Sequence, residues 1–310
     1  MATEKKKLPK VTEYYQNEEQ FSPGVAYCSG CALELNIRFI SKVLGKDAIF
    51  FGTPSCSAPV LHGQNTQPWH RHSYYANVMT GVASSATGVS RYYKRAGIDA
   101  TLVCYTGDGG AQDLGFQAIS GAAERNERMI YICYDNEGYM NTGVQRSSGT
   151  PFGASTSTTP AGKISQGKTT NRKDMPMIMS MHEIPYVATA SLSHLEDWAK
   201  KLVKAKEKSR EGFVYLHVFC PCLVGWRIPM DMSIQVCRAA VRTNYFPLWE
   251  AEDGVYRITQ KINKPRPIQE LTQMIGKFKH LNEENTEILQ QMVNKRFKIL
   301  QALCAMSEEI

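Results

Sequence analysis

Two short apolar runs, each followed at once by a glycine-containing turn, constrain this chain more than any other feature. The runs are ATLVCYT at residues 100–106 and MIYICY at residues 129–134. Both are short, apolar and bounded by turn residues, which is typical of strands buried in a parallel sheet. Residues 112–126 between them have the length and the apolar stripe of a helix. The pattern predicts a strand-helix-strand unit whose two turns meet at the carboxyl edge of a sheet, where open α/β folds bind ligands.

The two turns carry oxygen ligands and glycines. Asp108 lies in the GDGG turn at 107–110, and Asn136 and Gly138 lie in the DNEG turn at 135–138. Magnesium prefers oxygen ligands and usually takes one or two protein groups together with phosphate and water. Because Gly109 and Gly110 have no side chain, their backbone amides can approach a phosphate at the start of the following helix. These residues predict a magnesium-bound diphosphate, although a GDG alone is explained as well by an ordinary strand-to-helix turn.

Two nucleotide-binding motifs are absent from this region. The dinucleotide motif GxGxxG requires glycine at position 112, where this chain has Gln112, and no Walker A motif occurs. What remains is a GDG followed twenty-eight residues later by an asparagine. That pattern is similar to the thiamine diphosphate fingerprint.

The cysteines indicate a reducing environment and a metal site. Their number is odd, and the chain shows no signal peptide and no apolar run long enough to span a bilayer, so we expect a cytoplasmic protein with free thiols. Cys28 and Cys31 form a CxxC, Cys56 follows in a loop-like segment, and Cys220 and Cys222 end an apolar run. Four soft ligands from three loops indicate zinc or an iron-sulfur cluster, and a lone CxxC is also typical of a redox pair.

The other four cysteines have weaker signals. Cys104 and Cys133 lie inside the predicted strands and are expected to fill the core. Cys237 and Cys304 lie on helical patterns and indicate no site.

The chain resembles the beta subunit of the 2-oxoacid:ferredoxin oxidoreductases, a family of thiamine diphosphate enzymes that includes pyruvate:ferredoxin oxidoreductase. The resemblance covers roughly residues 20–250. It is carried by YCSGC at 27–31, GDGGAQDLGFQAISGAAERN at 107–126, YDNEGYMNTGVQRSSGTPFGAS at 134–155, IPYVATAS at 184–191 and the PC of FCPCLVGWR at 219–227.

The resemblance assigns roles to matching residues. It implies that Asp108 and Asn136 bind magnesium through their side chains, that Gly138 binds it through its carbonyl, and that Asn141 lies beside the substrate. It also implies a [4Fe-4S] cluster near the thiamine. The implied cluster ligands are Cys28, Cys31, Cys56 and Cys222, with Cys220 as the alternative for the fourth position.

Together these sites imply oxidative decarboxylation of a 2-oxoacid, because electrons left on the cofactor need a one-electron acceptor. A nonredox thiamine-dependent decarboxylase or synthase subunit with structural zinc is the first alternative. The second is a noncatalytic electron-transfer or scaffold subunit, which the intact Asp108, Asn136 and Asn141 disfavour.

The resemblance also implies partners. In the family, half of the thiamine site and the activating glutamate belong to another subunit, so we expect alpha-, gamma- and delta-type subunits and ferredoxin, with coenzyme A if the substrate is pyruvate. The net charge of +7 is accompanied by no nucleic-acid-binding signal. We therefore expect neither nucleic acid nor membrane as a partner, and a basic surface that is solvated or attracts an acidic ferredoxin.

The segment after Cys56 departs from the pyruvate-using members. It carries basic and imidazole side chains where those members have an acidic stretch: His62, His70, Arg71 and His72. Such groups suit a substrate with two carboxylates, and oxalate is the candidate; the alternative is that they face water or a partner subunit.

The expected organisation is an amino-terminal arm at 1–23, a domain at 24–250 and a linker with a helical arm at 251–310. Alternating strand and helix patterns predict an α/β domain with a doubly wound parallel sheet and a thiamine diphosphate-binding fold. Residues 145–174 are rich in Ser, Thr and Gly and predict a flexible loop covering the pocket, ordered by partner subunits. An apolar stripe predicts an amphipathic terminal helix that packs on its own domain or grips a neighbour; its residues are Leu289, Met292, Val293, Phe297, Leu300, Leu303 and Cys304.

Overall fold

One mainly parallel sheet organises the molecule. The structure, a computed structural model, describes residues 10–61 and 70–308, and within them the strands follow the order β2-β1-β3-β4-β6-β5-β7-β8. Neighbours from β2 to β5 are parallel, whereas β7 and β8 join antiparallel. The strands are β1 (Ala48–Gly52), β2 (Tyr74–Ala76), β3 (Thr101–Gly107), β4 (Met129–Asp135), β5 (Tyr186–Ser191), β6 (Phe213–Phe219), β7 (Trp249–Glu252) and β8 (Val255–Ile258). The predicted α/β class is confirmed.

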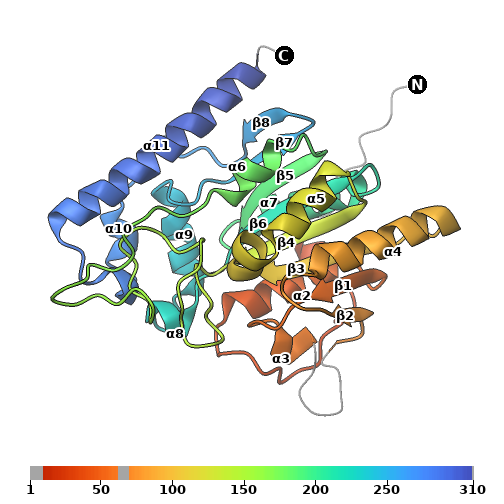
Figure 1. The fold of residues 1–310 in the computed structure, drawn as a ribbon, viewed down its shortest axis with the longest axis horizontal. Coiled ribbons are helices and arrows are strands. Elements are labelled where there is room, and N and C mark those ends of the chain that lie inside the picture. Colours follow the sequence, from red (N-terminus) through yellow and green to blue (C-terminus); the bar gives the residue numbers. More distant parts are fainter. Residues whose placement is uncertain (1–9, 62–69, 309–310) are drawn as a thin grey trace.

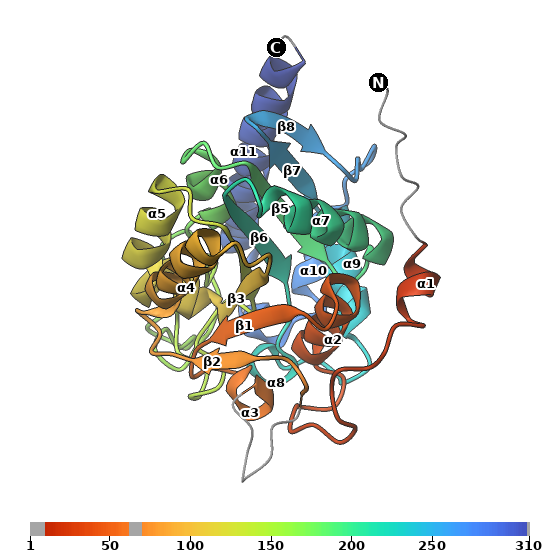
Figure 2. The same cartoon turned by 90° about the vertical axis from the view of Figure 1, so that its right-hand side faces the viewer.

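Helices cover both faces of the sheet (Figure 2). Along β4, Ile130 and Ile132 enter one apolar cluster with Trp198, whereas Tyr131 enters a second cluster with Ile119. A strand buried on both sides must be apolar throughout, which explains its unbroken sequence. The helices are α1 (Val11–Tyr14), α2 (Ala32–Leu44), α3 (Ala58–Leu61), α4 (Val82–Ala96), α5 (Phe116–Glu124), α6 (Met175–Ser180), α7 (Leu195–Lys208), α8 (Leu223–Trp226), α9 (Ser233–Arg242), α10 (Gln269–Thr272) and α11 (Glu283–Ser307), with shorter turns η1 (Gly109–Leu114) and η2 (Gly276–Phe278).

The connection after β3 begins earlier than predicted. The helix expected at 112–126 is a π-helical turn, η1, followed by α5. Gly115 donates its backbone N–H to the carbonyl of Gly110, five residues back, at 2.8 Å, which is the bond that defines a π turn. Such turns often occur at functional sites, and this one starts directly after Asp108.

The four strands that carry the predicted site are neighbours. In the order β1-β3-β4-β6 all are parallel, so their carboxyl ends share one edge of the sheet. The chain leaves these ends toward Cys56, Asp108, Asn136 and Cys222 respectively. Topology alone therefore brings together residues that are up to 166 positions apart in the sequence.

The sheet continues past the domain boundary expected near residue 250. That boundary falls inside β7, and β8 extends the sheet to Ile258. Beyond it, α11 runs along one side of the molecule (Figure 1), and its carboxyl half lies against β8. Leu289, Val293 and Leu300 on α11 are buried, so the predicted amphipathic helix packs on its own chain. None of the helices formed by residues 10–61 and 70–308 combines the length and the apolar character needed to cross a bilayer.

Candidate functional site

A pocket enclosing about 550 Å³ of space, part of it open to solvent, lies at the carboxyl edge of the sheet. It contains most of the residues predicted for the diphosphate and the substrate, and Cys56 forms part of its wall. The lining residues are Thr53, Pro54, Ser55, Cys56, Met79, Gly107, Gly109, Gly110, Tyr134, Asn136, Gly138, Tyr139, Met140, Asn141 and Thr142. Asp108 lies beside this pocket and is fully buried.

The carboxylate of Asp108, the carbonyl of Gly138 and one terminal atom of the Asn136 carboxamide converge beside the pocket. One side-chain atom of Asn136 lies 2.9 Å from Asp108 Oδ1 and 2.9 Å from the carbonyl oxygen of Gly138. With the amide oxygen in that position, three acceptors face one another and a cation among them would hold them together, whereas the amide nitrogen in that position would donate to both other oxygens. Octahedral magnesium has ligands at about 2.0–2.1 Å, which places adjacent oxygens about 2.9 Å apart. The donor set and its spacing therefore fit Mg²⁺.

Asp108 is buried close to other carboxylates. Burial, and then the negative charge of Asp135, raise the pKa of Asp108 well above its usual value, although the hydroxyl of Ser147 donates to its carboxylate and acts in the opposite sense. Burying a carboxylate next to other acids is unfavourable unless positive charge compensates it. A divalent cation among the three oxygens would provide that charge.

The loop that presents Asn136 and Gly138 is anchored through Glu137. This residue has a φ of +62°, in the left-handed region. The buried carboxylate of Glu137 accepts from Tyr245 at 2.6 Å, from Arg172 at 2.9 Å and from Lys277. Three groups from distant parts of the chain thereby fix a backbone conformation that is rare for a residue with a side chain.

The first turn after Asp108 has room for a bound group because of its glycines. A methyl group on Gly109 would overlap the ring of Tyr139, so only glycine fits at that position. The Tyr139 hydroxyl donates to Asp113 at 3.1 Å, which holds the ring against the turn. Gly109 and Gly110, at the start of η1, line the pocket, where a diphosphate site would need them.

The structure brings the four predicted cysteines together. Each thiol of the quartet, which consists of Cys28, Cys31, Cys56 and Cys222, has the other three as electrostatic neighbours. Burial, together with these neighbours, raises the pKa of Cys31 to about 11 and that of Cys56 to about 12. In the described part of the chain, no three His, Cys, Asp or Glu side chains are arranged around a single metal ion. The quartet is a group of neighbouring thiols that are not drawn around a single point in this structure.

Two thiols of the quartet lie at helix starts. Cys31 precedes α2, and Cys222 precedes α8 and accepts the backbone N–H of Gly225 at 3.3 Å. Backbone N–H groups lower the pKa of both thiols, against the larger effect of burial. Positions of this kind stabilise a thiolate, which is the form that binds metal.

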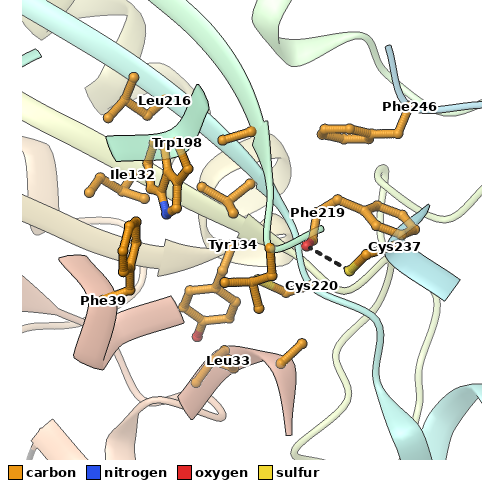
Figure 3. Packing of buried hydrophobic residues seen from close by; sticks show 14 of the residues in the cluster. Leu33, Phe39, Ile132, Tyr134, Trp198, Leu216, Phe219, Cys220, Cys237 and Phe246 are labelled. Carbon is orange, nitrogen blue, oxygen red and sulfur yellow. Dashed lines mark hydrogen bonds between the residues drawn. The ribbon is translucent and has the colours of Figure 1, made fainter. Parts of the chain in front are cut away.

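Cys220 belongs to the hydrophobic core. It is 1% exposed and packs with Leu33, Tyr134 and Phe219, near Cys237 (Figure 3). Its electrostatic neighbours include only one member of the quartet, Cys31. The geometry favours Cys222 over Cys220 as the fourth member. Cys104 and Cys133 are fully buried, which confirms the prediction that they fill the core.

Direct contacts join the quartet to the oxygen site. With the amide oxygen of Asn136 toward Asp108, its side-chain nitrogen lies 3.9 Å from Cys56 Sγ and donates to it. On the other side, Trp226 Nε1 donates to the backbone carbonyl of Asn136 at 2.9 Å. A methyl group on Gly225 would overlap Met140 Sδ and would lie 3.3 Å from Cys222 Sγ, so Met140 fills the space between the pocket and the quartet.

The basic residues expected at the substrate site lie elsewhere. His70 and His72 are buried, where their rings contact the carbonyl of Leu61 and the hydroxyl of Ser41, and burial lowers the pKa of both. Arg71 is exposed and pairs with Glu18, and His62 lies outside the described residues. The prediction of a basic patch for two carboxylates is wrong for the three described residues, because helix α2 and the first strands enclose the histidines.

The loop at 145–174 is irregular; most of residues 157–164 are exposed, whereas the parts of the loop on either side contain buried residues, which corrects the prediction of flexibility for those parts. Ser147, Thr150 and Arg172 are buried. Ser147 contacts Asp108, and Thr150 donates to the backbone carbonyl of Glu137 at 2.7 Å. The loop lies against the oxygen site through contacts made by this chain itself.

Thr53 is a pocket residue that the sequence pattern did not reveal. Its hydroxyl is buried and has no hydrogen-bond partner among the described residues, and it lines the pocket. Its position directly after β1 was the available signal, since Cys56 follows the same strand end.

Comparison with known proteins identifies the class. Residues 53–218 match the family described as "Thiamine pyrophosphate enzyme, C-terminal TPP binding domain", so the fold and the pocket define a thiamine pyrophosphate enzyme. The chain is 40% identical to pyruvate synthase subunit PorB of Methanocaldococcus jannaschii, with 92% of this chain and 98% of that subunit covered. It is also 40% identical to ketoisovalerate oxidoreductase subunit VorB of Pyrococcus furiosus, with 92% and 94% covered. The chain belongs to the beta subunits of the 2-oxoacid:ferredoxin oxidoreductases.

Two further similarities extend this picture. The beta subunit of NADH-dependent phenylglyoxylate dehydrogenase from Aromatoleum evansii is 42% identical, and the match covers 92% of this chain but 65% of that subunit. The solved 2-oxoglutarate:ferredoxin oxidoreductase from Magnetococcus marinus has the same fold, with a TM-score of 0.55 and 21% identity over 76% of this chain and 82% of that one.

Proposed function

We propose that the chain is the beta subunit of a complex that oxidatively decarboxylates a small 2-oxoacid and passes the electrons to a [4Fe-4S] cluster and then to ferredoxin. The observation that supports this most is the contact of Asn136 with both sites, since its side chain faces Asp108 and Gly138 on one side and Cys56 on the other. A cofactor site and a thiol quartet so close together suit an enzyme that transfers electrons between them.

In this proposal Asp108, Asn136 and Gly138 hold Mg²⁺, and the amides of Gly109 and Gly110 face the diphosphate. Thiamine diphosphate, when bound, supplies a carbon nucleophile for the keto group and retains the electrons after carbon dioxide leaves. The chain's own residues bind and orient this cofactor. Asn141, which lies exposed at the pocket wall, is placed to contact the substrate.

The thiol quartet would ligate the cluster as thiolates. A [4Fe-4S] cluster accepts one electron at a time. Cys31 and Cys222 gain backbone N–H donors at their helix starts, and these would favour the deprotonated ligands. Cys28 is exposed, so the side of the quartet that faces solvent is available to the partner that takes the electrons away. We place the complex in the cytoplasm, where free thiols and ferredoxin coexist.

The substrate is proposed to be a 2-oxoacid with a single carboxylate. Phenylglyoxylate, pyruvate and ketoisovalerate, after which the relatives are named, are all of this kind. Pyruvate and ketoisovalerate would require coenzyme A as acceptor of the acyl group, whereas oxalate would yield only carbon dioxide. The basic residues that suggested oxalate as the substrate do not support it, because His70, Arg71 and His72 do not line the pocket.

The test is an assay of the complete complex, purified anaerobically with its alpha-, gamma- and delta-type subunits. Turnover of pyruvate, 2-oxoisovalerate, phenylglyoxylate and oxalate is measured with ferredoxin, with and without coenzyme A, and iron, sulfide and zinc are quantified. We expect a brown complex with about four iron atoms bound by this chain and turnover of at least one monocarboxylic 2-oxoacid. A colourless, zinc-containing protein that decarboxylates without reducing ferredoxin would establish the nonredox alternative instead.

A further inference from the structure

The carboxamide of Asn136 fits its surroundings in two orientations. With its oxygen toward Asp108 and Gly138, three oxygens meet and the nitrogen donates to Cys56 Sγ at 3.9 Å. With its nitrogen toward them, it donates to Asp108 Oδ1 and to the Gly138 carbonyl, each at 2.9 Å, and the oxygen faces the sulfur. The first orientation requires a cation among the oxygens, whereas the second satisfies them without one.

The rest of the loop is fixed, so only the amide group has to rotate. The backbone carbonyl of Asn136 accepts from Trp226 at 2.9 Å, and the side chain of Glu137 is held by Arg172 and Lys277. The terminal torsion of an asparagine side chain has broad, roughly two-fold minima. Asn136 is 5% exposed, so water has little access to replace either partner.

We propose that Asn136 couples loading of the magnesium diphosphate to the reduction potential of the cluster that Cys56 ligates. The proposal rests on the proposed function. When the cofactor site is loaded, the amide nitrogen donates to Cys56 Sγ; when it is empty, the amide turns and the donor is withdrawn. An N–H donor to a cluster sulfur stabilises the reduced, more negative cluster and raises its potential. The cluster accepts one electron whether or not the cofactor is bound, and only its reduction potential changes.

This coupling favours electron transfer from the cofactor to ferredoxin over transfer in the opposite direction. A subunit with cofactor has a cluster that accepts an electron readily at the moment when the cofactor can supply one. A subunit without cofactor has a cluster that takes electrons back from reduced ferredoxin less readily. The effect is specific to Cys56, because no other thiol of the quartet accepts a hydrogen bond from Asn136 among the described residues.

The experiment uses the complete complex, from which Mg²⁺ and thiamine diphosphate are removed and then restored while the cluster is retained. The cluster bound by this chain is titrated by EPR in both states, and hyperfine spectra are recorded in D₂O. We expect a higher midpoint potential in the loaded state. Backbone N–H groups such as that of Gly225 contribute exchangeable deuterons in both states, and we expect one additional deuteron coupling to the reduced cluster in the loaded state that is absent in the empty state.

Two variants identify the source of the shift. Asn136→Asp retains an oxygen ligand but has no N–H, so the loaded variant is expected to lack both the deuteron coupling and the rise in potential. Gln145→Glu adds the same charge in the same loop, where the amide hydrogen-bonds to Thr142, and it is expected to retain both. If Asn136→Asp fails to bind the cofactor, the proposal is judged from the midpoint potential and the deuteron coupling of the wild-type complex in its empty and loaded states.

Failure of the coupling through Asn136 can be distinguished from failure of the proposed function. Equal potentials and unchanged deuteron coupling in wild-type complexes that bind both groups would overturn the role of Asn136 and leave the proposed function intact. A complex that binds no thiamine diphosphate or contains no iron would overturn the proposed function itself.

Discussion

Trp226 donates its indole N–H to the backbone carbonyl of Asn136 at 2.9 Å, in a fully buried contact. Trp226 ends the short helix that starts at Cys222, and Asn136 contributes to the oxygen site. The ammonium group of Lys277 lies 3.4 Å from the centre of the Trp226 ring and pairs with Glu137. One buried network therefore holds the loop of the fourth cysteine against the loop of the metal ligands.

Trp226→Phe removes this N–H and retains an aromatic ring for Lys277. The buried carbonyl of Asn136 loses its donor, which costs about 1–3 kcal/mol of the free energy of unfolding. Because Asn136 then loses an anchor, we also expect weaker magnesium-dependent binding of thiamine diphosphate, measured by calorimetry.

The matched control is Trp198→Phe, which removes an equally buried indole N–H, bonded to Asn36 at 3.0 Å. It should lower the stability to denaturant by a similar amount and leave cofactor affinity unchanged. Equal loss of affinity in the two variants would show that Trp226 acts only through global stability.

Asp108→Ala removes the charged member of the three-oxygen set. Since the two remaining oxygens are neutral, we expect magnesium-dependent thiamine diphosphate binding to fall by at least two orders of magnitude, which corresponds to about 3 kcal/mol. Asp99→Ala, at an exposed ion pair with Arg210, serves as the control. Undiminished cofactor retention by Asp108→Ala would contradict the metal assignment.

Cys222→Ser should reduce the iron content of the anaerobically purified chain much more than Cys220→Ser. Cys222 neighbours the other three members of the quartet, whereas Cys220 is enclosed by apolar side chains. Cys220→Ser places a hydroxyl in the core and is expected to lower stability by about 1–3 kcal/mol with iron retained. The opposite pattern of iron loss would make Cys220 the fourth ligand.

The central strands were predictable because their sequence leaves little choice. Residues 100–106 and 129–134 were expected as strands, and β3 and β4 agree to within one residue at each end. A run of apolar residues that is too short for a buried helix and ends at a glycine turn fits a strand covered on both faces. The parallel order then placed Asp108 beside Asn136 without further information.

The remainder of the site depends on contacts between distant segments. Glu137 and Lys277 are 140 residues apart, and no local pattern indicates that they meet. His70 and His72 looked polar in the sequence, yet Ser41 and the Leu61 carbonyl provide the partners that allow their burial. The loop at 145–174 has the composition of a flexible segment, and only tertiary contacts with Asp108 and Glu137 reveal that it is packed.

The pH dependence of stability should reveal how α11 is attached. Burial alone would raise the pKa of Asp174, but the charges of Arg296 and Arg172 outweigh it, so this pKa lies below its usual value of 3.8. A lowered folded-state pKa contributes stability that is present above pH 3.8 and is lost as the pH falls below it. Arg296 is on α11 and donates to Asp174 at 2.9 Å, so the lost contribution belongs to the attachment of this helix.

Asp174→Asn removes the titrating charge and keeps a hydrogen-bond acceptor. At pH 7 the variant should be less stable than the wild type by on the order of 1 kcal/mol, as expected for a partly exposed ion pair. The difference should persist from pH 7 down to about pH 4 and shrink as the pH falls below 3.8, where the wild-type carboxylate becomes protonated. Urea titrations of both proteins across this range measure the effect, and Arg296→Gln should add little in the Asp174→Asn background if the two side chains act as a pair. Parallel stability curves for wild type and Asp174→Asn would exclude the ion pair as the acid-sensitive tether of α11.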